Sequence, residues 1–437
     1  MRLVTTYLPD LNMSDSASTA NTTVTTPSRA AVIFIFITLT LDVLAMGIII
    51  PVLPKLIEGF VGGSSADAVR MGSVLGLVWA LMQFVFNPIQ GALSDRFGRR
   101  TVLLISMTGL GLDYILMALA PNLWWLIVGR ALSGITAASF STANAYIADI
   151  TPPEKRAAAF GMMGAAFGIG FVLGPLLGGV TGAIDPHLPF WIAAGLSLLN
   201  ALYGYFILPE SLPPERRAKV FSLAKANPLS SFKLLSSHPE LYGLATAQFL
   251  YMVAHNVYPA VFAWFVMYRY GWSEMMIGYS LAAVGVASIV VQGGLTGPVV
   301  KYLGERKSII VGLSFGIAGF LIYAVGPTGA WVWVAIPVSA LWSFYGPAAQ
   351  SIMTQRVSPS EQGQLQGALG SMNGISFIVA PILYPQVFAA AIDAKARLGD
   401  WPILGAPFFV AALLLIGAFL IAERATRSRR ITAETSS

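Results

Sequence analysis

The chain has 437 residues, of which 56% are apolar and only 11% are charged, and its mean hydropathy is +0.71. A water-soluble protein of this length needs more polar surface than this composition supplies, so lipid must cover most of the exterior. The formal net charge of +6 concerns membrane topology here and does not indicate a nucleic-acid partner. Cysteine is absent, which excludes a disulfide framework, a thiolate metal site and a cysteine nucleophile. We expect no cofactor and no metal.

The first 29 residues differ in composition from the rest of the chain. Residues 1–29 are rich in Ser, Thr, Asn and Ala, and they lack the apolar core of a cleaved signal peptide. A segment of this kind buries too little apolar surface to fold alone. We therefore expect a disordered cytoplasmic tail.

Twelve apolar runs follow, six before and six after a polar stretch. A helix of about 20 residues crosses the roughly 30 Å of bilayer hydrocarbon, and its backbone hydrogen bonds are satisfied internally. The expected fold class is therefore an all-α integral membrane protein with twelve transmembrane helices. The predicted spans are 30–54, 72–94, 101–120, 123–148, 157–182, 189–208, 241–268, 274–300, 307–326, 330–354, 364–391 and 401–422.

The polar stretch at 209–240 contains five prolines among basic residues, so it cannot span the bilayer. It separates a six-helix lobe at 30–208 from a second lobe at 241–422, which is followed by a tail at 423–437. Twenty of the 26 Lys and Arg residues fall on one side of this arrangement and five on the other. Because basic residues favour the cytoplasmic side, we predict that both termini and the linker are cytoplasmic.

Two motifs recur at the same offset in the two halves. Residues 91–100, Gly-Ala-Leu-Ser-Asp-Arg-Phe-Gly-Arg-Arg, form a charged turn after the second span, and residues 297–306, Gly-Pro-Val-Val-Lys-Tyr-Leu-Gly-Glu-Arg, follow 206 positions later. Pro175 and Pro381 are also 206 residues apart. Parallel repeats of this kind are typical of secondary transporters, so we expect two pseudo-symmetric lobes around a cavity.

From Ala31 to Ala422 the chain resembles the Major Facilitator Superfamily, and within it the tetracycline-resistance type of drug/proton antiporter. The resemblance is carried by the turn at 91–100, by Gly-Pro at 174–175, and by Leu-Asp at 41–42, Leu-Asp-Tyr at 112–114, Gly-Arg-Ala-Leu-Ser-Gly at 129–134 and Tyr-Ile-Ala-Asp at 146–149. It implies a monomeric transporter of the bacterial inner membrane that exports a lipophilic, drug-like molecule in exchange for protons by alternating access.

Three charged residues fall inside predicted spans and away from their ends, namely Asp42, Asp113 and Arg130. A charge within the bilayer costs several kcal/mol unless it faces a cavity or a partner, so such residues are candidates for proton or substrate handling. Arg130 stays charged and needs an acidic partner, for which Asp42 and Asp113 are the candidates. Protonation of that acid would break the pair and favour one lobe arrangement. The alternative is a permanent structural pair.

The charged turn is the candidate cytoplasmic gate. We expect its charges to bridge to Asp149 and to helix ends of the opposite lobe. The simpler hypothesis is that its positive charges only set the membrane topology. Lys301 occupies the place of Asp95 in the second copy, so a symmetric latch is not expected. The residues of this gate motif are Gly91, Asp95, Arg96, Gly98, Arg99, Arg100 and Asp149.

A glycine-rich stretch and several polar residues complete the candidate site. The glycines allow close helix contact and Pro175 can bend its span; the resemblance implies that this antiporter motif prevents leakage. It comprises Gly170, Gly174, Pro175, Gly178 and Gly179. Possible substrate contacts in the second half, which could equally be packing residues, are His255, Asn256, Gln292, Trp342, Tyr345 and Gln350.

The sequence departs from the tetracycline exporters in the second lobe. They generally carry an acid in the ninth span and often a histidine in the eighth, where this chain has an uncharged run at 309–325 and Ser288. Tetracycline itself is therefore not the expected substrate, because its magnesium chelate is cationic. The alternatives are a proton-coupled uptake symporter and a membrane receptor without transport. The chain has no Gly-x-x-x-x-Gly-Lys-Ser/Thr phosphate loop and no nucleophile or metal cluster, which argues against an ATP-driven pump and an enzyme.

Overall fold

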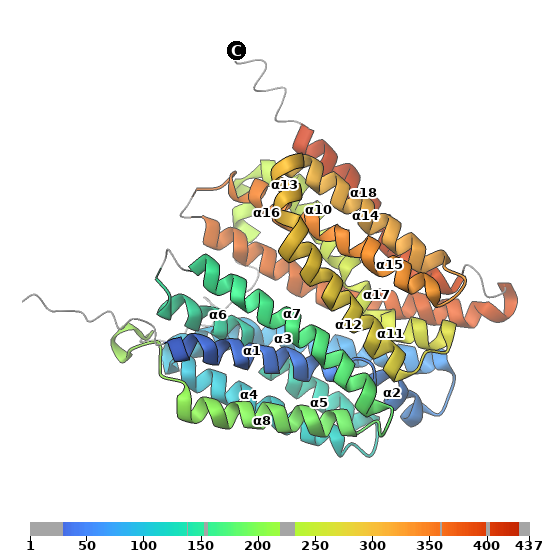
Figure 1. Cartoon of the computed structure of the whole chain (residues 1–437), viewed down its shortest axis with the longest axis horizontal. Helices are drawn as coiled ribbons and strands as arrows, with labels where there is room; N and C mark the ends of the chain where they lie inside the picture. Colours follow the sequence, from blue (N-terminus) through green and yellow to red (C-terminus); the bar gives the residue numbers. More distant parts are fainter. Residues whose placement is uncertain are drawn as a thin grey trace, which may run out of the picture.

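A computed structural model describes residues 29–137, 139–152, 156–218, 232–358, 361–398 and 403–427 of the chain, and this part is helical throughout (Figure 1). Residues 1–28 of the predicted N-terminal tail, residues 219–231 of the linker and the last ten residues lie outside the described residues. The first lobe contains α1 (Arg29–Ile49), α2 (Leu53–Val61), α3 (Ser65–Phe97), α4 (Arg99–Ala118), α5 (Leu123–Thr136), α6 (Ser139–Ile150), α7 (Arg156–Gly182) and α8 (Leu188–Ile207).

After the linker, the short helix α9 (Lys233–Ser237) precedes the second lobe. That lobe contains α10 (Tyr242–His255), α11 (Val257–Tyr270), α12 (Glu274–Val290), the π-helix η5 (Val291–Leu295), α13 (Thr296–Leu303), α14 (Glu305–Val325), α15 (Ala330–Ala340), the 3-10 helix η6 (Leu341–Phe344), α16 (Tyr345–Thr354), α17 (Gln362–Leu398) and α18 (Ala406–Arg427). α18 continues past the predicted end at Ala422, because hydropathy does not report a helix that leaves the membrane.

Eleven stretches of the described chain are long and apolar enough to cross a membrane, and the fourth predicted span is built from two shorter helices, α5 and α6. This agrees with the all-α fold and the twelve predicted spans. Several spans are interrupted: α10 meets α11 at Asn256, η5 follows α12, and η6 joins α15 to α16. Such interruptions inside membrane proteins are tolerated where the backbone faces protein or a water-filled cavity.

Close helix contacts explain how each lobe and the joint between them are built. In α7, the positions that Cβ atoms would occupy on Gly170, Gly174 and Gly178 lie 2.7, 2.6 and 1.9 Å from carbonyl oxygens of α1, so side chains cannot fit there. On another side of α7, a Cβ on Gly179 would lie 2.6 Å from the Glu274 carbonyl oxygen of α12. α7 therefore packs against its own lobe and against the opposite lobe through backbone contacts.

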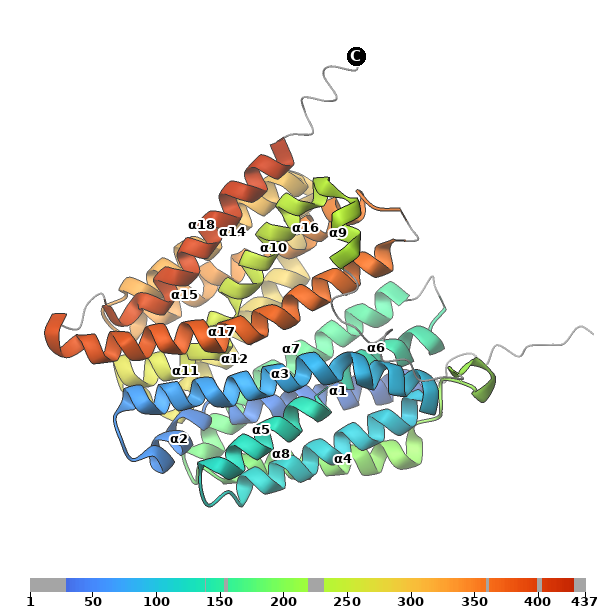
Figure 2. The same ribbon diagram turned by 180° about the vertical axis from the view of Figure 1, so that it is seen from behind.

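The two lobes meet at one end of the molecule, which we call the closed end and define by Lys55, Arg70, Glu274 and Asp393. Lys55 Nζ lies 2.7 Å from Glu274 Oε1, and Arg70 pairs with Asp393, so both ion pairs join the lobes. Further inward, Gly76 approaches Pro381. The ribbons of the two lobes separate toward the other end, the motif end, where the turns at Gly98 and Gly304 lie (Figures 1 and 2).

Candidate functional site

The buried carboxylates of the first lobe lie on two different helices. Asp42, on α1, is 4% exposed, and Asp113, on α4, is 1% exposed. Asn200 Nδ2, on α8, donates a hydrogen bond of 3.4 Å to Asp42 Oδ1. Asn200 is not among the predicted site residues, because its side-chain amide is uncharged and charge was the criterion that identified Asp42 and Asp113. Its position three residues after Ser197 on the same helix was the available signal.

Asp113 packs against α5 at a glycine. A Cβ on Gly129 would lie 2.9 Å from Asp113 Oδ1, so only glycine lets the two helices approach here. The Ser133 side chain of α5 hydrogen bonds to the Asp113 carboxylate, and Arg130 interacts with it electrostatically. An enclosed carboxylate with so few polar partners is costly to ionise, which makes it a candidate for proton exchange.

Arg130 has a different partner from the one expected. It forms no ion pair within 4 Å with Asp113, with which it interacts electrostatically at longer range. Its guanidinium instead lies over the Trp79 ring, 5.2 Å from the ring centroid. Trp79 in turn contacts Phe377 of the opposite lobe edge to face, with centroids 5.9 Å apart. In this conformation a cation–π contact therefore replaces the predicted salt bridge and leads directly to the lobe interface.

The turn between α3 and α4 is held by backbone geometry and charge. Gly98 has φ +98°, and a Cβ there would lie 2.1 Å from Glu210 Oε2. The Arg99 backbone N–H donates to Glu210 Oε1 at 2.9 Å, and Arg99 Nε donates to Asp149 Oδ2 at 3.1 Å. Arg99 also pairs with Asp95. The turn thus ties α3, α4 and α6 to the start of the linker.

The other residues of the turn contribute less to this network. Arg100 Nη2 donates to the Tyr205 carbonyl oxygen at 2.6 Å, and the Arg96 guanidinium lies over the Phe97 ring. These contacts and those of Arg99 all belong to the first lobe and the linker. The expected bridge from the turn to the opposite lobe is absent from the described residues in this conformation, because the lobes are apart at the motif end.

The second lobe contains a counterpart of this network with altered charge. Gly304 also has a positive φ of +79°, and Glu305 follows it where Arg99 follows Gly98. Gln355 Nε2 donates to Glu305 Oε1 at 3.0 Å, and Ser351 also hydrogen bonds to Glu305. Gln355 lies 206 residues after Asp149, so the offset of the repeat would have located this pair from the sequence.

The antiporter motif lies at the joint between the lobes. Pro175 Cδ lies 2.9 Å from a Cβ position on Gly47 of α1, while the Pro175 carbonyl oxygen lies 2.5 Å from a Cβ position on Gly278 of α12. In the second copy, Ser73 Oγ of α3 donates to the carbonyl oxygen of Pro381. Both prolines are therefore at inter-lobe contacts.

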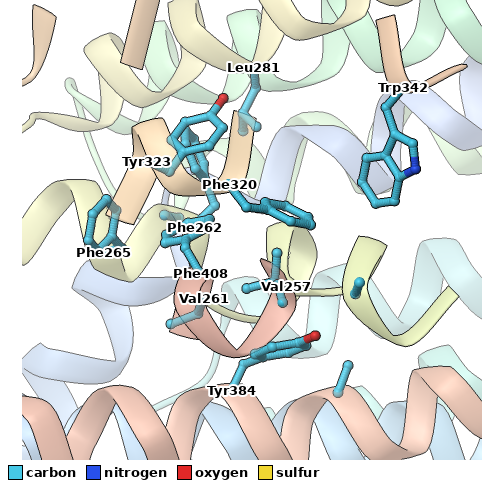
Figure 3. Packing of buried hydrophobic residues seen from close by; sticks show 14 of the residues in the cluster. Val257, Val261, Phe262, Phe265, Leu281, Phe320, Tyr323, Trp342, Tyr384 and Phe408 are labelled. Atoms are coloured by element: carbon cyan, nitrogen blue, oxygen red, sulfur yellow. The ribbon is translucent and has the colours of Figure 1, made fainter. Parts of the chain in front are cut away.

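The centre of the second lobe is an aromatic cluster, which we define as Tyr251, Tyr258, Phe320, Tyr323, Trp342, Tyr345 and Phe408. Figure 3 labels four of its members, Phe320, Tyr323, Trp342 and Phe408. Tyr251 and Tyr345 are stacked with centroids 4.4 Å apart, and Trp342 meets Tyr251 edge to face at 4.7 Å. Trp342 Nε1 and the Tyr345 hydroxyl have no hydrogen-bond partner among the described residues, while the hydroxyls of Tyr258 and Tyr323 hydrogen bond to each other and to Ser339. Unpaired polar tips on a packed aromatic surface leave donors available to a ligand.

The remaining predicted substrate contacts separate into two kinds. His255, Gln292 and Gln350 are exposed, and the His255 ring lies 5.4 Å from that of Trp342. Asn256 is buried, and its Nδ2 donates to Ser376 Oγ at 2.8 Å and to the Met252 carbonyl oxygen at 3.0 Å. The amide of Asn256 thus fixes the break between α10 and α11 to α17. Among the described residues, no cluster of three or more His, Asp or Glu could hold a metal ion.

Comparison with known proteins decides the family. A model of the Major Facilitator Superfamily matches residues 35–381. The chain belongs to the Major Facilitator Superfamily. This confirms the family expected from the motifs, and with the helical architecture it makes the chain a multi-pass membrane protein of a transporter family.

Curated relatives and solved structures agree with this assignment. The chain is 41% identical over 389 residues to the class C tetracycline resistance protein of Escherichia coli, covering 88% of this chain and 96% of that protein. It is 34% identical over 396 residues to the class B protein of the same species, covering 90% and 96%.

Two solved structures share the fold of this superfamily member. One is a bacterial homologue of the human lysosomal transporter Spinster in an inward-facing, unoccupied conformation, with a TM-score of 0.73 and 19% identity over 91% of this chain and 96% of that chain. The other is the human organic anion transporter MFSD10, with a TM-score of 0.68 and 23% identity over 91% and 99%.

Proposed function

We propose that this protein is a proton-coupled efflux transporter of the bacterial inner membrane, which exports a lipophilic, drug-like molecule by alternating access. The observation that carries the proposal is the enclosure of Asp42 and Asp113 in a lobe that is similar, over nearly its whole length, to the tetracycline resistance proteins. Carboxylates at such depth are retained where protons or substrates pass. The protein acts as a monomer, with both termini in the cytoplasm and the motif end facing the cytoplasm.

Alternating access is supported by the arrangement of contacts between the lobes. Two inter-lobe ion pairs and the backbone contacts of α7 hold the closed end together, while among the described residues the contacts of the turn at Gly98 are with its own lobe and the linker. With the motif end placed on the cytoplasmic side, this state would accept substrate from inside the cell. Closing the motif end would bring the charged turn toward the second lobe and act as the gate.

The aromatic cluster supports a substrate with flat, apolar rings. Tyr251, Trp342 and Tyr345 present ring faces and edges. Trp342 Nε1 and the Tyr345 hydroxyl are also without a hydrogen-bond partner among the described residues. The α14 segment beside them has no acidic residue between Ser308 and Val325. A cationic magnesium chelate would find no counter-charge on that segment, so we propose that the second lobe binds an uncharged part of the substrate, from the tetracyclines or a wider set of drugs.

A transport experiment distinguishes export from the two alternative functions. The gene is expressed in a pump-deleted bacterial host, susceptibility is measured with a chemically diverse drug panel, and everted vesicles from the same cells are given each compound that shows protection. Export in exchange for protons raises the luminal pH on addition of compound. Luminal acidification would instead identify an uptake symporter, and the absence of both protection and pH change across the panel would favour a receptor.

A further inference from the structure

We propose that Asn200 is a positioning residue that orients the carboxylate of Asp42 and responds to its charge. The inference rests on the proposed function, in which Asp42 carries a coupled proton. Asn200 is 1% exposed and lies on α8, directly against α1. No substrate or gate motif accounts for a buried amide at this position, so its hydrogen bonds indicate what it does.

Asn200 contacts two successive turns of α1. Its Nδ2 donates to Asp42 Oδ1 at 3.4 Å and to the carbonyl oxygen of Thr38 at 3.3 Å. The Thr38 hydroxyl donates to Asn200 Oδ1 at 3.1 Å. Thr38 and Asp42 are four residues apart and share one face of α1, so a single amide bridges both.

This pattern fixes which way the amide faces. If the amide were turned over, Asn200 Oδ1 would face the Thr38 carbonyl oxygen and the Asp42 carboxylate, and three acceptors would meet without a proton between them. The Thr38 hydroxyl holds the observed orientation by donating to Oδ1. The Asn200 N–H thereby donates to the ionised carboxylate of Asp42. When Asp42 is protonated, the negative charge that strengthens this hydrogen bond is lost.

Few other ionisable groups surround Asp42. α7 packs along α1 and carries none after Arg156, and α8 contributes only Tyr203 and Tyr205, which are exposed. α6, which also packs against α1, carries Tyr146 and Asp149. Tyr114 on α4 interacts electrostatically with Asp42, and also with Asp113 and Arg130. Asn200 is thus a neutral donor to Asp42 from α8.

Infrared titration of the purified full-length protein tests the inference without a substrate. The carboxylic C=O band that Asp42→Asn removes is assigned to protonated Asp42, and its intensity is followed with pH. Asn200→Ala withdraws the donor that favours the ionised form, so the midpoint of this band is expected to move to higher pH by about one unit, or about 1.4 kcal/mol. Thr38→Val frees the amide to turn and is expected to shift the midpoint in the same direction by less.

Ser197→Ala is the matched control. Ser197 is buried on α8 one turn before Asn200, and its hydroxyl has no hydrogen-bond partner, so its removal disturbs the same helix without touching the bridge. An unchanged midpoint in Asn200→Ala overturns the inference, as does an equal shift in Ser197→Ala. If Asn200→Ala does not reach the membrane, Thr38→Val is the test, and an unchanged midpoint of the Asp42 band in that variant also overturns the inference. Retention of full proton coupling in both Asp42→Asn and Asp113→Asn would instead overturn the proposed function.

Discussion

Replacing Gly179 by alanine should open the closed end. A Cβ at this position would lie 2.6 Å from the Glu274 carbonyl oxygen and 3.1 Å from the Cα atoms of Met275 and Gly278, all on the opposite lobe. These are backbone atoms, so the clash is relieved only by moving α7 away from α12. Inserting one methyl group into a tight contact costs about 1–3 kcal/mol. Because the cost exists only while the lobes touch here, it shifts the equilibrium toward the outward-open state by roughly fivefold to a hundredfold.

A single-cysteine reporter measures that shift. The chain has no cysteine, so Ser73→Cys places one thiol at the lobe interface, where Ser73 is buried and donates to the Pro381 carbonyl oxygen. Labelling of this thiol in intact cells by a membrane-impermeant maleimide should be faster with Gly179→Ala. Gly164→Ala is the control on the same helix, because a Cβ there meets nothing within 4 Å. Equal labelling rates in the two variants would refute the proposed role of this contact.

Two further predictions concern the loops. Gly98→Ala should lower the melting temperature in detergent more than Gly304→Ala, because both positions have positive φ but only the Cβ at Gly98 meets an obstacle, Glu210; equal losses would show that backbone strain alone sets the cost. Donation from Ser358 lowers the pKa of Glu361 below its usual 4.5, so this contact stabilises the start of α17 above that pH and is lost as pH falls through the lowered value. The protection factors of amides in the first turn of α17 should therefore fall as the pH drops below 4.5, and Glu361→Gln should remove this dependence on pH.

The sequence predicted the number of membrane crossings because each crossing requires a long apolar run, and it predicted the twofold repeat because two motifs share one offset. It did not predict where spans are interrupted. The break at Asn256 involves Ser376 of another helix, which accepts a hydrogen bond from the Asn256 side-chain amide, and at η5 the Thr296 hydroxyl donates to the Val291 carbonyl oxygen. Hydropathy averages over such positions and cannot report them.

The candidate site shows a similar division. Asp42, Asp113 and Arg130 were identifiable because charge is rare in apolar spans, but their partners were not. Arg130 lies over Trp79, and Asn200 bridges α8 to α1 over a separation of 158 residues from Asp42. Pairwise geometry of this kind follows from how the helices pack, which composition and spacing alone do not determine.

We propose that the enclosed carboxylates of the first lobe couple protons to substrate export. Asp42→Asn and Asp113→Asn keep the shape of each side chain and remove its proton, so each variant should reach the membrane. In everted vesicles given a compound that the unmodified protein exports, we expect at least one of the two variants to lose the substrate-dependent alkalinisation of the lumen. Full alkalinisation in both single variants would contradict it.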